Sequence, residues 1–429
     1  MNTNIFKQTL ASVRQQPVLS IVAVTGTALA IFLIMVVVMM QQVMVAPFSP
    51  ESNRDRLLHA QYGSIKALNE SDGWSSNGPI SEKSAKALYK SLDTPEAVTI
   101  HQAFLETSSA VIPGGTPVEV DLSKTDDDFW KVFDFRFIHG KPYDKAAFDA
   151  GLKQAVITRS VARAVFGTED VVGREFKLDY TAYSVAGVVE DVSTLASAAY
   201  AQVWIPYTSS PVETWNSGLM GSMRATLLAK SRDDFDAIKK EVEHNYAKYN
   251  EEIVPTGWKF VPFGRPYDQE TASICFDASS EPDVTISRRK RFVVYLILLI
   301  VPAINLSSMT DSRMRQRVSE IGVRRAFGCL RSEIALQIIS ESLIITLFAG
   351  ALGWLMSVVF AYLCGSMLFT QPFSATLNPP SVDVSMLIQG STFLWALLFC
   401  FILNLLSSGI PSWRASRTKI VTALNGNKH

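Results

Sequence analysis

The residues best suited to chemistry are three consecutive acids, Asp126 to Asp128, and a set of scattered histidines. Three adjacent carboxylates could hold a metal ion, but acids also favour the first turn of a helix, where they face unpaired amide groups. We expect the second role, with Thr125 or Asp126 capping a short helix. The histidines lie far apart in the sequence, at positions 59, 101, 139 and 244.

Recognisable catalytic and nucleotide-binding motifs are missing from the sequence. It contains no GxSxG, HExxH or GxxxxGK[ST] pattern, so a serine hydrolase, a zinc protease and a P-loop ATPase are all disfavoured. The four cysteines, at 275, 329, 364 and 400, form no CxxC pair. We therefore expect no catalytic residue, no metal site and no cofactor bound by this chain.

Four long uncharged runs dominate the organisation of the chain. Only 19% of its residues are charged, below the roughly 25% usual in soluble proteins. Because about 20 apolar helical residues cross a bilayer, we predict a membrane protein with four transmembrane α-helices and a large α/β (α+β) domain inserted between helices 1 and 2. The first run is too long for the apolar region of a secretory signal, so we expect it to remain as an anchor. The runs are 18–45, 292–309, 342–370 and 384–413.

Basic residues indicate which loops face the cytoplasm. The two termini and the loop after the second run hold twelve Lys or Arg against three acids, whereas 371–383 has no Lys or Arg. Short basic loops stay in the cytoplasm, which places the large segment outside; the basic run 288–291 is the one feature against this orientation. The predicted segments are 1–17 (cytoplasmic N-terminus), 18–45 (helix 1), 46–287 (outer domain), 288–310 (helix 2), 311–333 (cytoplasmic loop), 334–370 (helix 3), 371–390 (short outer loop), 391–413 (helix 4) and 414–429 (cytoplasmic tail).

The outer segment has the pattern of a mixed α/β domain. With 28 basic and 35 acidic residues over 46–291, it is mildly acidic, which disfavours a nucleic-acid surface. Ser160 is the expected N-cap of a short helix and Gly167 its C-terminal residue. Predicted strands are 155–158, 203–206 and a hairpin of 175–178 with 183–189 around Asp179. Five tryptophans are expected in the core rather than in a ligand groove: Trp74, Trp130, Trp204, Trp215 and Trp258.

The middle of this segment resembles the periplasmic core domain of MacB-type permeases. In that family such a stretch forms a subdomain inserted into a second one, and the resemblance implies an inserted subdomain at about 115–212 between the halves 46–114 and 213–287. Seven short pieces carry the resemblance, in the family's order: 128–133, 139–142, 155–158, 165–167, 172–174, 185–188 and 203–206.

The loop after the second run predicts an amphipathic helix, because Met314, Val318 and Ile321 share one helical face. Gly328 is the expected end of that helix, and Ser332 the expected cap of the next. A basic loop lying on anionic lipid is the alternative.

The same loop resembles the signature of the FtsX-like permease family. The resemblance rests on residues 320–328, then on Ile334, Gln337, Glu341 and Gly350-x-x-Gly353, and on the C-terminal Pro411-x-x-Arg414-Ala415-Ser416-Arg417. In that family the loop is a coupling helix seated on the nucleotide-binding subunit. The resemblance implies ATPase contacts at Glu320, Ile321, Gly322, Arg324, Arg325 and Gly328.

Small and polar residues should set helix packing in the membrane. Gly26-x-x-x-Ala30, Gly350 and Ala349-x-x-x-Gly353 permit close helix approach, and Pro302 should kink the second helix. Asn305 and Asn404 need partners at membrane depth, and each could serve the other. The first run extends about 42 Å as a helix, longer than the roughly 30 Å bilayer core, so we expect it to rise as a stalk into the outer domain.

The two resemblances together imply a transport permease subunit of a bacterial ABC transporter, in the inner membrane with its large domain in the periplasm, and not an enzyme. A separate dimeric ATPase subunit would bind ATP and Mg, and a second permease chain, identical or paralogous, would complete the assembly. The expected mechanism is mechanotransmission for efflux or export, with a periplasmic adaptor and an outer-membrane duct as further partners. Two alternatives stay open: a Lol-like permease that extracts lipoproteins, and an FtsX-like regulator of a cell-wall hydrolase without cargo.

Overall fold

The computed structural model describes residues 17–69, 73–210, 218–316, 322–323, 326–368 and 390–416. The chain divides into two compact units. One contains residues 1–42, 285–364 and 384–429, and the other contains 43–284 and 365–383. We call them the membrane unit and the outer domain, and describe each by itself.

Four long helices make up the described part of the membrane unit, and each contains most of one of the four uncharged runs. They are α2 (Pro17–Val45), α9 (Val284–Gln316), α11 (Arg331–Leu368) and α13 (Gly390–Ser416). By length and composition, Val24–Val45 and Ser332–Cys364 could cross a membrane, while the apolar stretch Leu394–Gly409 is shorter. Two spans are therefore indicated within the described residues, and the predicted count of four is not established by them.

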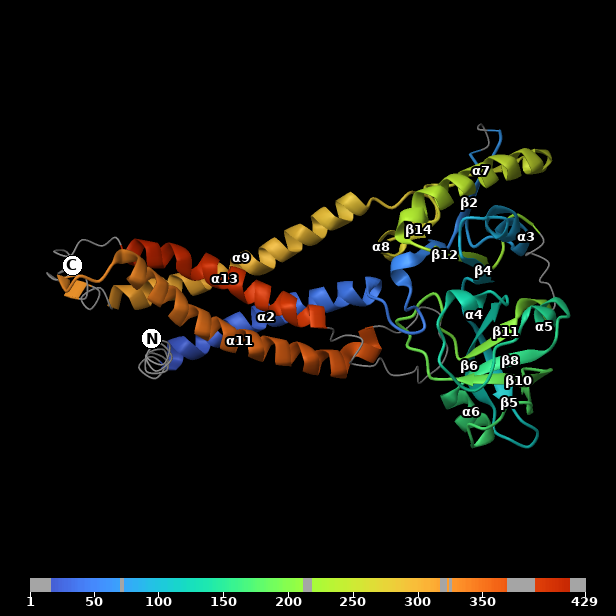
Figure 1. Ribbon diagram of the computed structural model, residues 1–429, viewed down its shortest axis with the longest axis horizontal. Coiled ribbons are helices and arrows are strands. Elements are labelled where there is room, and N and C mark those ends of the chain that lie inside the picture. Colours follow the sequence, from blue (N-terminus) through green and yellow to red (C-terminus); the bar gives the residue numbers. More distant parts are fainter. Residues whose placement is uncertain are drawn as a thin grey trace. The chain divides into compact units, whose positions relative to one another are not determined.

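The helices of the membrane unit run alongside one another (Figure 1). They pack through small and apolar side chains. Ile34 of α2 lies in one cluster with Leu299 of α9 and Leu403 of α13. A Cβ added at Gly353 would lie 2.5 Å from the Ala28 carbonyl oxygen of α2, and one at Gly350 would collide with the Cys400 sulfur of α13. Glycine is thus needed at Gly353, where the opposing atom belongs to the backbone, while at Gly350 a larger residue would require the Cys400 side chain to move.

Six strands of the outer domain close into a ring. In ring order they are β11 (Val203–Pro206), β8 (Gln154–Thr158), β10 (Thr181–Val189), β9 (Glu175–Leu178), β5 (Glu106–Val111) and β6 (Val118–Thr125), and β6 pairs back with β11. Strand β7 (Phe137–Gly140) adds to β10. A closed ring leaves no free sheet edge. Its interior is filled by an apolar cluster that includes Leu122, Phe176 and Val188.

A second group of strands continues the sheet from β6. Strand β4 (Ala97–Gln102) pairs with β6 only at His101 and Thr125, and then β12 (Met223–Leu228), β1 (Leu57–Ala60) and β14 (Tyr267–Asp268) follow. Because β1 and β4 precede the ring in sequence while β12 and β14 follow it, the ring is inserted between two halves that pair with each other. The ring begins with β5 at Glu106, earlier than the predicted start of the inserted subdomain at residue 115.

Helices and a small sheet complete the outer domain. The long helix α7 (Phe235–Ile253) packs with α3 (Glu82–Ala85), η3 (Lys86–Lys90) and the sheet of β2 (Gly63–Ala67), β3 (Ser75–Gly78) and β13 (Trp258–Phe260) around one apolar cluster (Figure 1). The remaining short elements are η1 (Arg54–Arg56), α4 (Phe129–Val132), α5 (Lys145–Asp149), α6 (Arg159–Phe166), η4 (Tyr207–Ser209), η6 (Arg232–Asp234), η7 (Val254–Thr256) and α8 (Gln269–Ser273).

The predicted strands and the hairpin are confirmed, but two predicted caps are wrong. Ser160 lies inside α6, and the side chain of Thr158 accepts from the amide of Val161 instead, because β8 runs directly into the helix. Gly167 ends α6 with φ 75°, as expected. Helix α11 begins at Arg331, before the predicted cap Ser332.

Candidate functional site in the outer domain

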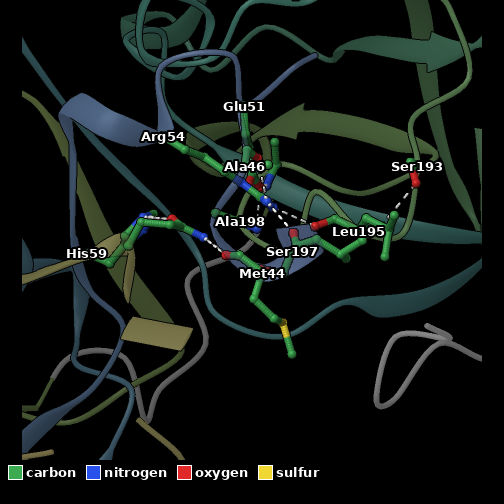
Figure 2. A network of polar contacts seen from close by, with 12 residues as sticks. Met44, Ala46, Glu51, Arg54, His59, Ser193, Leu195, Ser197 and Ala198 are labelled. Atoms are coloured by element: carbon green, nitrogen blue, oxygen red, sulfur yellow. Dashed lines mark hydrogen bonds and ion pairs between the residues drawn. The ribbon is translucent and has the colours of Figure 1, made fainter. Parts of the chain in front are cut away.

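The end of α2 is held in the outer domain by one buried arginine. Arg54, 1% exposed, follows α2 in the short turn η1. Its Nη1 donates to the carbonyl oxygens of Val43 at 2.7 Å and Ala46 at 3.1 Å, and its Nη2 donates to Leu195 O at 2.6 Å (Figure 2). The last carbonyls of a helix lack partners within the helix. Arg54 supplies a donor for the carbonyl of Val43, and its bond to Leu195 connects the helix end to the loop between β10 and β11.

The charge of Arg54 is balanced by Glu51, which is equally buried. The Nε of Arg54 donates to Glu51 Oε2 at 2.6 Å, and both side chains are 1% exposed. The other carboxylate oxygen, Oε1, accepts from the amides of Ala198 at 2.7 Å and Ala199 at 3.0 Å. A buried ion pair is tolerated when further hydrogen bonds satisfy both partners, and here they do. The pair links the helix end, the turn that follows it and the 195–199 loop.

A second contact holds the same helix end through α8. The side chain of Gln269 donates from Nε2 to Met44 O at 2.7 Å and accepts at Oε1 from His59 Nε2 at 2.8 Å (Figure 2). Burial lowers the pKa of His59 to about 4, which keeps its imidazole neutral at pH 7. The Nε2 proton of that imidazole fixes the orientation of the Gln269 amide. Two consecutive helix carbonyls, at Val43 and Met44, are therefore capped by the outer domain.

A cavity of about 450 Å³ lies beside this cap. Its walls come from the end of α2, β1, the residues after β4, the 194–200 loop, β12 and α8. All of the lining residues belong to the outer domain. The volume falls in the range of small-molecule sites.

Arg224 of β12 is the main cationic group in this cavity that has no acidic partner. Its Nη2 donates to Ser197 O at 3.1 Å and Ala198 O at 2.9 Å, and its Nε donates to His101 Nδ1 at 3.4 Å. Burial lowers the pKa of Arg224 to about 10 and that of His101 well below its usual value, so at pH 7 the arginine is charged and the imidazole neutral. Within the part of the chain that the structure describes, no carboxylate forms an ion pair with Arg224.

The acidic run 126–128 has a structural role. Asp126 accepts from the Phe129 amide at the start of α4, and it also pairs with Lys90 at 2.8 Å. Asp126 thus satisfies the first amide of α4, although the N-cap position itself is Asp128, whose side chain forms no capping bond. No group of three or more His, Cys, Asp or Glu side chains in the described ranges could hold a metal ion.

The tryptophans divide between core and surface. Trp130 and Trp204 pack with Phe135 in an aromatic cluster. Trp258 is partly buried against the α7 cluster, whereas Trp74 is 71% exposed, so for Trp74 the expected core position is wrong. Trp215 lies outside the described residues.

Most residues predicted to contact an ATPase lie outside the described ranges: Glu320, Ile321, Arg324 and Arg325. Gly322 is helical and buried, and Gly328 has φ 94°, a left-handed conformation that suits a helix end. After it, the amide of Leu330 donates to Glu333 Oε2 at 3.0 Å. The side chain of Glu333, not of Ser332, thus satisfies an amide at the start of α11.

The predicted membrane packing residues all lie in the long helices. Asn404 of α13 donates to Ile339 O of α11 at 3.4 Å and accepts from Ser408 Oγ at 3.4 Å. Helix α9 continues through Pro302 and Asn305, whose side chains are not among those described. Gly26 is partly buried in α2.

Sequence reasoning missed Arg54, Glu51 and Arg224. The spacing of Glu51 and Arg54, three residues apart just after the first apolar run, was the one signal available for the ion pair. Nothing in the sequence marks Arg224, because its partners are backbone carbonyls and a histidine distant in the chain.

Two family models match the chain. Residues 19–245 match a MacB-like periplasmic core domain, and residues 292–420 match an FtsX-like permease C-terminal domain. The first match alone covers more than half of the chain.

Curated MacB proteins and the solved periplasmic region of a MacB protein are similar to this chain. The macrolide export ATP-binding/permease protein MacB of Pasteurella multocida is 24% identical over 310 residues, which is 72% of this chain and 43% of that protein. The corresponding protein of Burkholderia cenocepacia is 24% identical, over 59% of this chain and 36% of its own length. The chain thus spans less than half the length of these relatives. The periplasmic region of MacB from Actinobacillus actinomycetemcomitans aligns with 48% of this chain and 89% of its own at 16% identity and a TM-score of 0.33.

Proposed function

The chain belongs to the MacB/FtsX-like family of ABC transporter permeases, and from that membership we propose that it couples ATP hydrolysis by a partner ABC ATPase to movement of its outer domain. The transport direction we propose is efflux or export across the bacterial inner membrane. Two permease chains and two ATPase subunits would form the working complex.

The observation that supports this coupling is the double cap at the end of α2. A motion of a helix moves a domain only if the joint between them resists rotation and sliding. The carbonyls of Val43 and Met44 are bonded to Arg54 and Gln269, and Arg54 is itself fixed by Glu51. These bonds reach the loop at 195–199 and helix α8, which flank different parts of the sheet. A displacement of the helix end would therefore carry the outer domain as a rigid body.

The coupling would begin at the loop 311–333. We propose that its helix seats on the ATPase, with Glu320 and Arg324 setting the register through charge complementarity, since such charges determine specificity more than affinity. Closure of the ATPase dimer would press two such loops together. Four membrane-spanning helices per chain would then pass the movement to the outer side of the membrane.

Affinity purification of the full chain from gently solubilised cells tests this function. We expect the wild type to retain an ABC ATPase subunit, with measurable ATP hydrolysis, and the variant Glu320→Lys/Arg324→Glu to lose it. The matched control is Arg163→Glu/Glu169→Lys, which reverses an ion pair at the surface of the outer domain, with side chains 65% and 24% exposed, and should leave the complex intact. Wild-type protein that carries no ATPase, or loop variants that retain it fully, would contradict the proposal.

A further inference from the structure

The cavity beside the α2 cap has the chemistry of a binding site. Its volume of about 450 Å³ is enough for a small organic molecule. Arg224 lines it and is partly buried. The carbonyls of Ser197 and Ala198 fix the orientation of that group.

The guanidinium of Arg224 does not use all of its hydrogen-bond donors within the domain. Nε and Nη2 are used within the domain, while Nη1 donates to no residue in the described ranges. Arginine presents paired donors that match a carboxylate or a phosphate. A group of this kind, oriented by the protein and not neutralised by it, is suited to bind an anion from outside.

The charges around Arg224 support this reading. The two histidines that line or adjoin the cavity, His59 and His101, are neutral at pH 7 because burial lowers the pKa of each. The other nearby cation, Arg54, is paired with Glu51. Among the side chains that line the cavity, Arg224 is thus the cation without a paired carboxylate, and the nearby carboxylates are engaged elsewhere: Glu51 pairs with Arg54, and Asp121 accepts from the Tyr200 hydroxyl.

Apolar side chains complete the lining. Met44, Phe104 and Phe276 are 46%, 43% and 87% exposed, and all three border the cavity. Exposed apolar groups beside one oriented cation are complementary to a molecule with an anionic head and an apolar body.

We propose that this cavity binds an amphipathic anion, whose carboxylate or phosphate pairs with Arg224 and whose apolar part lies against Phe104 and Phe276. The proposed binding does not require an ATPase partner, although Met44, Arg54 and Gln269 of the α2 cap also line the cavity. A membrane lipid and a soluble organic anion share this chemistry, and the test below separates them.

The probe is 1-naphthyl phosphate, a soluble fluorescent anion, titrated into the full chain in dodecyl maltoside. We expect saturable binding, with neutral 1-naphthol and inorganic phosphate each at least about tenfold weaker, since either lacks half of the required chemistry. Arg224→Met should weaken the probe at least about tenfold, and Arg224→Lys should weaken it less. Arg136→Met, at an exposed arginine of the same domain, should change nothing.

A second variant keeps the test decisive if Arg224→Met folds poorly. Ala272→Trp on α8 fills the cavity without altering any charge, and it should also abolish probe binding. Competition by lysophosphatidate incorporated in phosphatidylcholine nanodiscs would identify a lipid as the source, while probe binding without such competition would identify a soluble anion. Equal binding by wild type, Arg224→Met and Ala272→Trp, or no binding by the wild type at millimolar probe, would overturn the proposal.

Discussion

The outer domain contains two arginines in opposite electrostatic settings. Arg54 is 1% exposed, paired with Glu51 and bonded to three backbone carbonyls. Arg224 is partly exposed to a cavity, is bonded to two carbonyls and a neutral imidazole, and has no acidic partner among the described residues. The first arrangement uses a charge to hold the chain together. The second leaves a charge available, which is what a binding site needs.

Removal of the Arg54 guanidinium should cause the largest loss of stability. Arg54→Met leaves the buried carboxylate of Glu51 without its partner and removes the donor to the Val43, Ala46 and Leu195 carbonyls, which costs about 3–5 kcal/mol. Denaturant unfolding of the full chain, followed by tryptophan fluorescence, measures this. The double variant Glu51→Gln/Arg54→Met should recover part of the loss, because no unpaired charge stays buried. A cost below about 1 kcal/mol would show that the pair does not hold the helix end.

Acid should weaken the α2 cap through His59. The pKa of His59 is lowered to about 4 in the folded chain from 6.5 when unfolded. Below pH 6.5 the unfolded chain binds a proton that the folded chain does not, so stability falls as the pH drops from 6.5 to 4. The shift corresponds to about 3 kcal/mol at most.

Unfolding free energies at pH 7 and pH 4.5 measure this effect. His59→Gln should lose that part of the acid sensitivity, while the same change at exposed His244 should leave it unaltered. His101 is also buried with a lowered pKa, so some acid sensitivity should persist in His59→Gln. An unchanged pH dependence in His59→Gln would contradict the assignment.

How far the sequence predicts this molecule depends on the range of the interactions involved. Local patterns were sufficient for the strands at 155–158 and 203–206, for the hairpin around Asp179 and for the glycine that ends α6. The family resemblance drawn from short motifs is confirmed by the two family models. Each of these features is encoded within a few neighbouring residues.

Features that depend on distant partners could not be predicted. The Nη2 group of Arg54 binds a carbonyl 141 residues away, and Nε of Arg224 contacts a histidine 123 residues away. Every residue carries a backbone carbonyl, so the sequence does not indicate which carbonyls these arginines will bind. The roles of Arg54 and Arg224 therefore have no sequence motif. The misplaced cap at Ser160 has a different cause: Thr158 and Ser160 are both good caps, and only the end of β8 decides between them.

The comparison predicts a smaller cost for Arg224 than for Arg54. Arg224→Met removes three hydrogen bonds but leaves no buried charge unpaired, and its carbonyl partners can be reached by water from the cavity. We expect a loss of about 1–2 kcal/mol, measured in the same unfolding experiment as Arg54→Met. A loss equal to that of Arg54→Met would mean that Arg224 is a structural group, and the contrast between the two arginines would fail.

The smallest expected effect comes from Gln269, which lies between the cap and the cavity. Gln269→Ala removes the bond to Met44 O and the bond from His59, and should cost about 1 kcal/mol. Gln269→Glu separates the two bonds: its carboxylate can accept from the His59 imidazole but cannot donate to Met44 O. A negative charge there favours the imidazolium form and raises the pKa of His59. Compared with Gln269→Ala, Gln269→Glu should therefore lose less stability between pH 6.5 and 4, and an equal loss in the two variants would show that His59 does not sense this contact.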